Sequence, residues 1–389
     1  MGKVLQFVYG LESGGIEAFV TNLNGCREIF DEPFDFLLYN SSDHVEFYEK
    51  INKDLGSNIY KFGDNCFSNF VIRCIQKRIR AYQFMKTHHY DVVHIHNSSV
   101  FCILEAIAAK AAGIPKVIVH SHNTVMGGTA GIKFFKNIIQ IIGKSFWRFF
   151  ADEYCACSTE AGIWMFGEKA VKKGKVHILK NGIRGDLFYF DDNVRREYRK
   201  KLGWEDNYII GHVGRFNKQK NHTFLMDIFA EVYRLEPKAR LLMFGVGELQ
   251  NEIKKKAEKL GLLKYVNFYG TSNEINCWLQ AMDLYLFPSL YEGLPVSGIE
   301  AQASGVPLLS SDTISPEMEV TNCVSWMSIE ESAAHWAEKA VSLLKTIPIE
   351  RNQRKAIQNA GYDIKETAGI LKEMYRIEKL GYKIWRIMD

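Results

Sequence analysis

Residues 283–311 have the sequence DLYLFPSLYEGLPVSGIEAQASGVPLLSS, which contains a strand, a helix and a second strand in turn. The apolar runs Leu284–Phe287 and Pro307–Ser310 have the length of strands that are buried on both faces. Pro295 breaks the chain between the first run and a helical pattern over Ser297–Ser304. A strand that returns through a crossover helix predicts a parallel sheet with right-handed connections.

The same alternation of short apolar runs and helical patterns extends along the chain in two series. The first series of expected strands is Val4–Tyr9, Phe34–Tyr39, Val92–His96, Lys116–His120, Tyr154–Ala156 and Val176–Leu179. The second series adds Ile209–Val213, Arg240–Phe244 and Val266–Tyr269 to the two runs above. Helical patterns between them include Gly15–Leu23, Leu104–Ala112, Lys220–Leu235 and Leu249–Leu260. The sequence therefore predicts an α/β fold of two Rossmann-like domains with parallel sheets that face an interdomain cleft, where ligands bind at the carboxyl ends of the strands.

The first series of strands ends near Asn181–Asp192, where a polar stretch begins. We therefore predict an N-terminal domain over residues 1–185 and a C-terminal domain over residues 186–370. The helical pattern of Ala368–Met388 predicts a final helix, over residues 371–389, that extends the second domain or crosses back onto the first.

Composition excludes several classes of protein. In 389 residues, 47% are hydrophobic and 24% are charged, which excludes a disordered chain. The net charge of +4 is too small to indicate a nucleic-acid partner. Because the chain has no signal peptide and no apolar run of about 18 residues, we expect a cytoplasmic protein without a transmembrane helix. The eight cysteines form no C-x-x-C pair, which favours reduced thiols over a zinc site.

Two glycine-containing loops follow expected strands. Gly14 and Gly15 open a helix after the first strand, and such glycines let a phosphate or sugar approach the backbone. A plain strand-to-helix turn explains them equally well. After the first strand of the second series, Arg215 and Lys220 leave a strand end together, an arrangement that suits a diphosphate. The pair in isolation is better explained by a solvated basic loop, but its position at a strand end, where ligands bind, weakens that explanation.

The most informative motif places two carboxylates around the start of a helix. Glu292 lies in the loop, and Glu300 lies about one turn into the helix, where it suits sugar hydroxyls. The first N–H groups of the helix, at Val296, Ser297 and Gly298, are expected to be available to a phosphate. A glycosidase pair, with carboxylates about 5 Å apart, is improbable at this spacing.

Four histidines follow or end two expected strands of the first domain. His94 and His96 alternate on one strand, and His120 and His122 alternate at the end of the next. They predict a hydrogen-bond donor in the cleft, and buried histidines or a four-histidine metal site are the alternatives. No carboxylate accompanies them, which disfavours the metal site. We favour His122 over His120 as the accessible ring because it lies beyond the strand end.

Together these residues resemble the large retaining glycosyltransferase family 4, which has the GT-B fold and is typified by bacterial capsule and exopolysaccharide transferases. The resemblance covers nearly the whole chain. Its motifs are Gly14-Gly15-Ile16-Glu17, His122, Asn181-Gly182-Ile183, Gly214-Arg215, Gln219-Lys220, Gly245-Val246-Gly247 and the pair Glu292 and Glu300. The family usually has Asp after Asn-Gly-Ile, where this chain has Arg184, so contacts near that loop are expected to differ.

The resemblance implies a mechanism in which a nucleotide sugar is the donor and no metal or other cofactor is needed. Arg215 and Lys220 would stabilise the leaving diphosphate. Glu292 would contact hydroxyls of the donor sugar, Glu300 would contact the ribose, and His122 would contact the donor sugar or a developing positive charge. The other residues that it assigns to the substrate site are Gly15, Asn181, Gly270, Gly293, Leu294, Val296 and Ser297.

The resemblance also implies partners. The donor is expected to carry UDP, with GDP-mannose as a competitor, and the acceptor to be a glycan or a polyprenyl-diphosphate-linked sugar held on the N-terminal domain. Residues 131–150 read GIKFFKNIIQIIGKSFWRFF, a basic amphipathic pattern that suits an anionic membrane or a core helix with a basic edge. A nucleotide-sugar 2-epimerase and a non-catalytic subunit of a transferase complex are the alternative functions.

Overall fold

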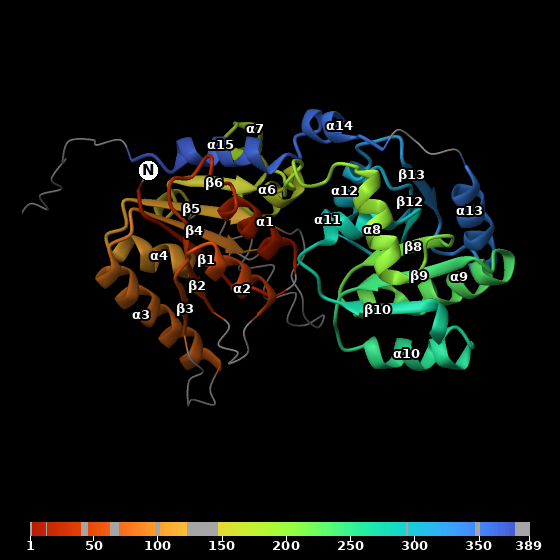
Figure 1. The fold of residues 1–389 in the computed structure, drawn as a ribbon. Coiled ribbons are helices and arrows are strands. Elements are labelled where there is room, and N and C mark those ends of the chain that lie inside the picture. The colour runs from red at the N-terminus through yellow and green to blue at the C-terminus, as the bar shows by residue number, and fades with distance from the viewer. Residues whose placement is uncertain are drawn as a thin grey trace, which may run out of the picture. The chain divides into compact units, whose positions relative to one another are not determined.

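The computed structural model describes residues 2–12, 14–39, 46–62, 70–97, 102–122, 147–292, 295–346 and 351–377. The chain forms two compact units, and the coloured ribbon of Figure 1 shows that each contains a sheet with helices packed around it. Unit 1 comprises Met1–Lys180 together with Lys365–Asp389, and unit 2 comprises Asn181–Ile364. The units therefore divide after Lys180 and after Ile364, whereas the sequence placed the boundaries after residues 185 and 370.

Unit 1 has a parallel sheet, whose seven strands among the described residues follow the order β3-β2-β1-β4-β5-β6-β7. The strands are β1 (Val4–Val8), β2 (Asp35–Leu38), β3 (Ile59–Lys61), β4 (Val92–Asn97), β5 (Lys116–Ser121), β6 (Glu153–Ala156) and β7 (Val176–Ile178). The helices are α1 (Gly15–Asn24), α2 (Phe47–Asp54), α3 (Phe70–His88), α4 (Ile103–Ala111), α6 (Thr159–Phe166), α7 (Glu168–Lys172) and α15 (Ile364–Met374), and Trp147–Phe149 form a short 3-10 turn.

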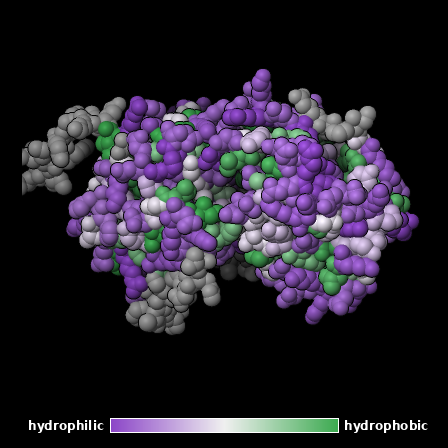
Figure 2. Space-filling view, viewed as in Figure 1, coloured by the Kyte–Doolittle hydropathy of each residue, from purple (hydrophilic) through white to green (hydrophobic). Residues whose placement is uncertain are grey.

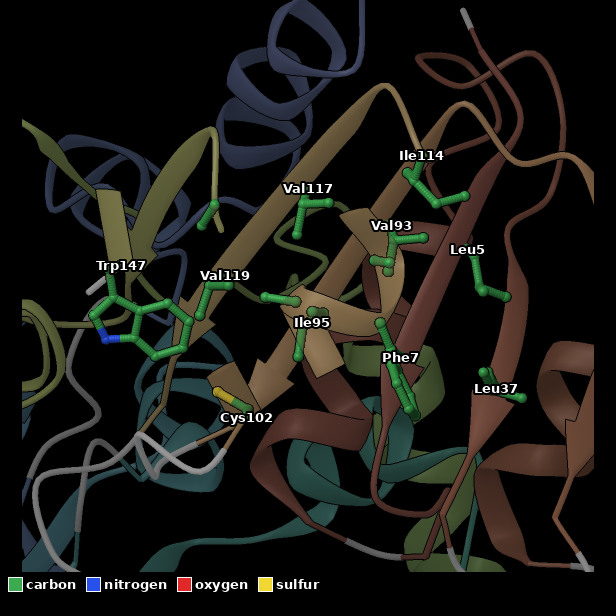
Figure 3. Packing of buried hydrophobic residues seen from close by; sticks show 14 of the residues in the cluster. Leu5, Phe7, Leu37, Val93, Ile95, Cys102, Ile114, Val117, Val119 and Trp147 are labelled. Atoms are coloured by element: carbon green, nitrogen blue, oxygen red, sulfur yellow. The ribbon is translucent and has the colours of Figure 1, made fainter. Parts of the chain in front are cut away.

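Alternate residues of the central strands separate an apolar face of this sheet from a polar one. Val93 and Ile95 of β4 pack with Phe7 and Val119 in the cluster drawn in Figure 3, which α3, α4 and α6 complete. Successive side chains of a strand point to opposite faces, so His94 and the other histidines of these strands lie on the second face. That face carries the unit's candidate site residues.

Unit 2 has a second parallel sheet, whose six strands within the described ranges follow the order β10-β9-β8-β11-β12-β13. The strands are β8 (Tyr208–Val213), β9 (Ala239–Phe244), β10 (Val266–Gly270), β11 (Leu284–Phe287), β12 (Leu308–Ser311) and β13 (Val324–Met327). The helices are α8 (Asp192–Leu202), α9 (His222–Leu235), α10 (Gln250–Lys259), α11 (Ile275–Ala281), α12 (Val296–Ala303), α13 (Ala333–Lys345) and α14 (Arg354–Asn359). Two apolar clusters cover the two faces of the sheet.

The edge strands β3 and β13 were not predicted. Their residues are only partly buried, and β13 contains a serine, so neither presents the continuous apolar run that marks a central strand. All other strands lie within a residue or two of the predicted runs. The central ones are buried on both faces, and the partly exposed edge strands β7 and β10 were predicted as well.

The two connections between the units run side by side within unit 2. Ile183 donates its backbone N–H to the carbonyl of Tyr362 at 2.8 Å and accepts the N–H of Ile364 at 2.9 Å. A Cβ atom on Gly182 would lie 2.7 Å from the backbone nitrogen of Ile364, so this approach requires glycine. At the other end of α15, the Lys116 ammonium donates to the carbonyl of Met374 at 2.8 Å.

No helix within the described ranges combines the length and apolar character that crossing a bilayer demands. The face drawn in Figure 2 is mostly hydrophilic, with hydrophobic residues scattered over it. The predicted basic amphipathic segment at 131–150 lies outside the described residues except for its last four. Membrane contact therefore stays a prediction.

Close backbone contacts position the loops at the carboxyl edge of the second sheet. Gly214 donates its N–H to the carbonyl of Phe244 at 2.9 Å, and Phe216 donates to the carbonyl of Val246 at 3.1 Å. Gly245 has φ +126°, and a Cβ atom there would lie 2.1 Å from the carbonyl oxygen of Gly214. The glycine therefore lets the loop after β9 pack directly on the loop that carries Arg215.

Replacing Gly245 by alanine is expected to lower the melting temperature of the full chain much more than replacing Gly261. Both glycines have positive φ, but no atom lies within 4 Å of a Cβ built on Gly261, which has φ +71°. Gly261→Ala should therefore cost only the local backbone strain, about 1–2 kcal/mol, whereas Gly245→Ala adds a backbone collision. Differential scanning fluorimetry measures both, and equal melting temperatures would contradict the packing role of Gly245.

Candidate functional site

The carboxyl edge of the second sheet holds a nearly buried ion pair. The Lys220 ammonium lies 2.7 Å from Oε1 of Glu292, and the two side chains are only 14% and 7% exposed. Gln219 donates from Nε2 to the other carboxylate oxygen of Glu292 at 3.0 Å. The structure therefore brings two predicted site residues together and adds Gln219, which belongs to the same motif as Lys220 but had been given no role.

Local hydrogen bonds fix the turn that carries Lys220. Residues 218–220 form a short 3-10 turn, which Asn217 begins by accepting the Lys220 N–H on its side chain at 3.2 Å. Asn221 ends the turn in the left-handed conformation with φ +53°, a geometry that asparagine tolerates. Its side-chain amide donates to the carbonyl of Pro288 at 3.2 Å, and Leu290 donates its N–H to the carbonyl of Gln219 at 2.8 Å. The loop after β8 is thus bonded to the loop after β11.

Gly214 and Phe287 also fix the position of the Lys220 side chain. A Cβ atom on Gly214 would lie 3.0 Å from the Lys220 Cδ and Cε atoms, so glycine leaves room for this side chain. The ammonium lies 4.9 Å from the ring centroid of Phe287 at the end of β11, a geometry that favours a cation. Ring, carboxylate and turn together hold a positive charge at the strand ends.

The start of α12 lies in the same part of unit 2. By helix geometry, the N–H groups of Val296 and Ser297 have no carbonyl partner within the helix. The expectation that the Gly298 N–H is also available is wrong, because it donates to the carbonyl of Pro295 at 3.0 Å. Gly293 and Leu294 lie outside the described residues.

Glu300 and Tyr285 have shifted acid–base properties. Glu300 is partly buried, and the loss of water around its carboxyl raises its pKa to about 8, so it is mostly protonated at pH 7. It can then donate a hydrogen bond as well as accept one, whereas the sequence predicted a group that only accepts. Burial raises the pKa of Tyr285 well above its ordinary value. Its protonated hydroxyl hydrogen-bonds both the N–H and the carbonyl of Val213, at 3.0 Å each, which fixes the end of β8.

The remaining predicted residues of unit 2 differ in their surroundings. Arg215 is exposed, and Asn181 is buried near the paired connections. Gly270 ends β10 with φ +86° and accepts the N–H of Gly245 at 2.7 Å. Arg184 stands where the family that the sequence resembles usually has Asp. It forms an ion pair with Asp186 at 2.9 Å.

Two predicted site residues lie in unit 1. Gly15 begins α1 and is exposed, and no described atom lies within 4 Å of a Cβ built on it, so packing does not require glycine there. His122 follows β5 and is partly buried, whereas His120 is completely buried. Of these two rings, only His122 is accessible to a ligand.

The buried histidines of unit 1 come close enough together to raise the question of a metal ion. Candidate ligand atoms of His94, His96 and His120 lie within 4.8 Å of one another. In a tetrahedral zinc site, nitrogens with Zn–N bonds of about 2.0 Å would lie about 3.3 Å apart. Both ring nitrogens of His96 are already in hydrogen bonds, and the three ligands include no anion that would offset a divalent charge. The hydrogen bonds of His96 therefore disfavour metal ligation by that ring, whereas both ring nitrogens of His120 and Nε2 of His94 make no hydrogen bond within the described residues.

Comparison with known families gives two matches that together cover most of the chain. Residues 38–186 match the family model described as Glycosyltransferase Family 4. Residues 194–363 match the model described as Glycosyl transferases group 1. The boundary between the matches lies near the first connection between the units.

The chain is also similar to individual glycosyltransferases of known sequence and to solved structures. The chain is 31% identical over 383 residues to the "Putative glycosyltransferase EpsF" of Bacillus subtilis, covering 96% of each chain. It is 28% identical, over 64% of each chain, to the UDP-Gal:alpha-D-GlcNAc-diphosphoundecaprenol alpha-1,3-galactosyltransferase of Escherichia coli. The crystal structure of Anabaena HepE in complex with UDP and glucose matches with a TM-score of 0.74, covering 97% of this chain and 100% of that one. At 17% identity this last likeness shows a shared fold.

Because Lys220 and Glu292 form an ion pair, the effects of Lys220→Met and Glu292→Gln on the free energy of unfolding should be strongly non-additive. Each single change leaves one buried charge without its partner, which costs about 3–5 kcal/mol. The double variant removes both charges and should recover much of the lost stability. Chemical denaturation of the full chain measures this cycle, with Lys218→Met as a control on an exposed lysine of the same turn. Additive effects would show that the two side chains do not stabilise each other.

Proposed function

Because the chain belongs to glycosyltransferase family 4, we propose that this glycosyltransferase moves a hexose from a UDP-sugar with retention of the anomeric configuration. The proposed acceptor is a glycan or a polyprenyl-diphosphate-linked sugar in surface polysaccharide biosynthesis. Membership of this family confirms the resemblance seen in the sequence, and the predicted GT-B fold of two Rossmann-like domains is confirmed as well.

The observation that carries the proposal is the Lys220 ammonium fixed at the carboxyl edge of the second sheet. Ligands of open parallel sheets bind at this edge. Departure of a nucleoside diphosphate places negative charge on its phosphates, and a cation already in position stabilises that charge without reorganisation. An ammonium group has three donors, so Lys220 can hold Glu292 and a phosphate oxygen at the same time.

Neighbouring groups extend this assignment to the rest of the donor. We assign Arg215 to the diphosphate as a second cation, and the free N–H groups that begin α12 to a phosphate oxygen. With two cations supplied by the chain, the proposed reaction needs no metal ion and no cofactor besides the nucleotide sugar itself. Glu300, protonated at neutral pH, does not repel the diphosphate and can still bind ribose hydroxyls.

The acceptor part of the proposal draws on a relative. The name of the Escherichia coli enzyme specifies a UDP-linked donor, a diphosphoundecaprenol acceptor and an alpha linkage. By this analogy we propose a lipid-linked acceptor for the present chain. In the proposed reaction Glu292 binds hydroxyls of the transferred sugar, held for that purpose by Lys220 and Gln219. His122 contacts the same sugar.

Transfer can be tested with UDP-glucose, UDP-galactose, UDP-N-acetylglucosamine and GDP-mannose, each supplied with a synthetic polyprenyl-diphosphate-linked sugar. We expect acceptor-dependent transfer from a UDP-sugar, and proton NMR of the first product should show the α configuration of the donor. Lys220→Met should lower the rate by about 10²–10³, whereas Lys218→Met should not. A β-linked product would overturn the retaining mechanism. Turnover of the donor without acceptor would favour an epimerase.

A further inference from the structure

Unit 2 contains a pocket at the edge of its sheet that lies opposite to Lys220 and Glu292. Asp283 and Pro307 line this pocket, and they immediately precede β11 and β12. Because the strands are parallel, their amino ends lie at one edge of the sheet and their carboxyl ends at the other. The pocket is therefore separate from the proposed donor site, and the proposed function gives it no role.

The pocket has the size and the lining of a site for a small organic molecule. Its volume is about 440 Å³, and ligand pockets usually measure about 300–1,000 Å³. The apolar side chains of its wall are Phe190, Pro307, Leu343 and Leu344. The charged side chains of its wall are Arg195, Arg351, Asp192 and Asp283. A wall that combines apolar side chains with a few charged groups is typical of ligand sites.

The two carboxylates of this wall already have arginine partners. Asp283 binds two guanidinium groups at once, because Arg195 donates from Nη2 to its Oδ1 and Arg199 donates from Nη1 to its Oδ2 at 3.0 Å. Asp283 also accepts the backbone N–H of Ile209 on Oδ2 at 2.7 Å. Asp192 pairs at 2.9 Å with Arg196, whose side chain is 70% exposed. Neither carboxylate is therefore left to neutralise a further cation.

Arg351 is that further cation, and it forms no ion pair with a carboxylate of the described residues. Its guanidinium donates to backbone carbonyls instead, from Nε to Ser304 at 3.4 Å and from Nη2 to Met282 at 3.3 Å. The centre of the guanidinium lies 4.3 Å from the ring centroid of Phe190. Burial, and then the positive charge of Arg195, lower the pKa of Arg351 to about 10, so the group remains charged at pH 7.

Both arginines of the wall keep donors that a ligand can use. Nε of Arg195 and Nη1 of Arg351 donate to no described acceptor, and neither atom is buried from solvent. The planar N–H groups of a guanidinium match the oxygens of a phosphate. The four arginines and two aspartates named above leave an excess of two positive charges. A phosphate monoester carries a charge of about −1.5 to −2 at pH 7, which offsets this excess.

We propose that this pocket binds a small organic phosphate monoester, with its phosphate on the guanidinium groups of Arg195 and Arg351 and its apolar part against Leu343. The excess of positive charge favours a phosphate over a carboxylate, which brings only one negative charge. The apolar wall favours an organic phosphate over the inorganic ion. The inference does not rest on the proposed function, because its residues lie at the opposite edge of the sheet from Lys220.

Phenyl phosphate is the probe, because it joins a phosphate monoester to one apolar ring. Isothermal titration calorimetry of the full chain, with UDP in excess to occupy the donor site, should show saturable binding. Inorganic phosphate lacks the ring, benzyl alcohol lacks the anion, and phenylacetate carries a single charge. Each of these three compounds should bind at least about 10-fold more weakly than phenyl phosphate. Absence of phenyl phosphate binding, or equal binding of any of the three, would overturn the proposal.

Two variants test the position of the probe by different means. Arg351→Met removes the charge at similar side-chain length and should weaken phenyl phosphate binding about 10-fold or more. Leu343→Trp fills the pocket, leaves both guanidinium groups in place and should prevent binding. Lys220→Met changes only the donor site and should bind the probe as the wild type does. The wild-type affinity in both Arg351→Met and Leu343→Trp would show that the probe binds elsewhere, and would overturn the proposal.

Matched substitutions at exposed positions control for changes in stability. Arg376→Met removes an exposed guanidinium from unit 1, and Leu260→Trp adds the same ring to an exposed leucine at the end of α10. Both should bind phenyl phosphate with the affinity of the wild type. A loss of affinity in these controls as large as that in Arg351→Met and Leu343→Trp would contradict binding in this pocket.

Discussion

The ion pair of Lys220 and Glu292 is the interaction on which the unit 2 site depends. It joins loops that follow β8 and β11, which are neighbours in the sheet, and both charges are nearly buried. Separating such charges is expensive, so the pair holds the two loops in one arrangement. A cation held in this way can stabilise the negative charge of a departing diphosphate without first being ordered. Electrostatic catalysis depends on such preorganised charges.

The candidate residues of unit 1 are held by a different physical means. There burial lowers the pKa of His96, which is neutral at pH 7, and this ring is hydrogen-bonded to the accessible ring of His122. In both units the fold places a polar side chain beyond the carboxyl end of a strand and fixes it through residues buried behind it. Rigid support of this kind is expected where the position of a single atom affects a reaction rate.

Much of the fold was predictable because its signal is local. β11 occupies the predicted run Leu284–Phe287, since four consecutive buried apolar residues leave little choice of structure. Contacts between distant parts of the chain were not predictable in this way. Gln6 is hydrogen-bonded to His96, 90 residues away, and to Tyr375, 369 residues away, and a neutral amide in an apolar run carries no motif. Lys220 was predicted as a phosphate ligand, but its pairing with Glu292 emerged only from the fold.

The most direct test of the account is the affinity for UDP of the Lys220→Met/Glu292→Gln double variant, measured by isothermal titration calorimetry beside the wild type and beside UMP. The double variant leaves no buried charge unpaired, so a loss of binding reports on the cation rather than on misfolding. We predict that the wild type binds UDP more tightly than UMP and that the double variant loses most of this difference. An undiminished preference for UDP in the double variant would contradict the claim that Lys220 holds the diphosphate.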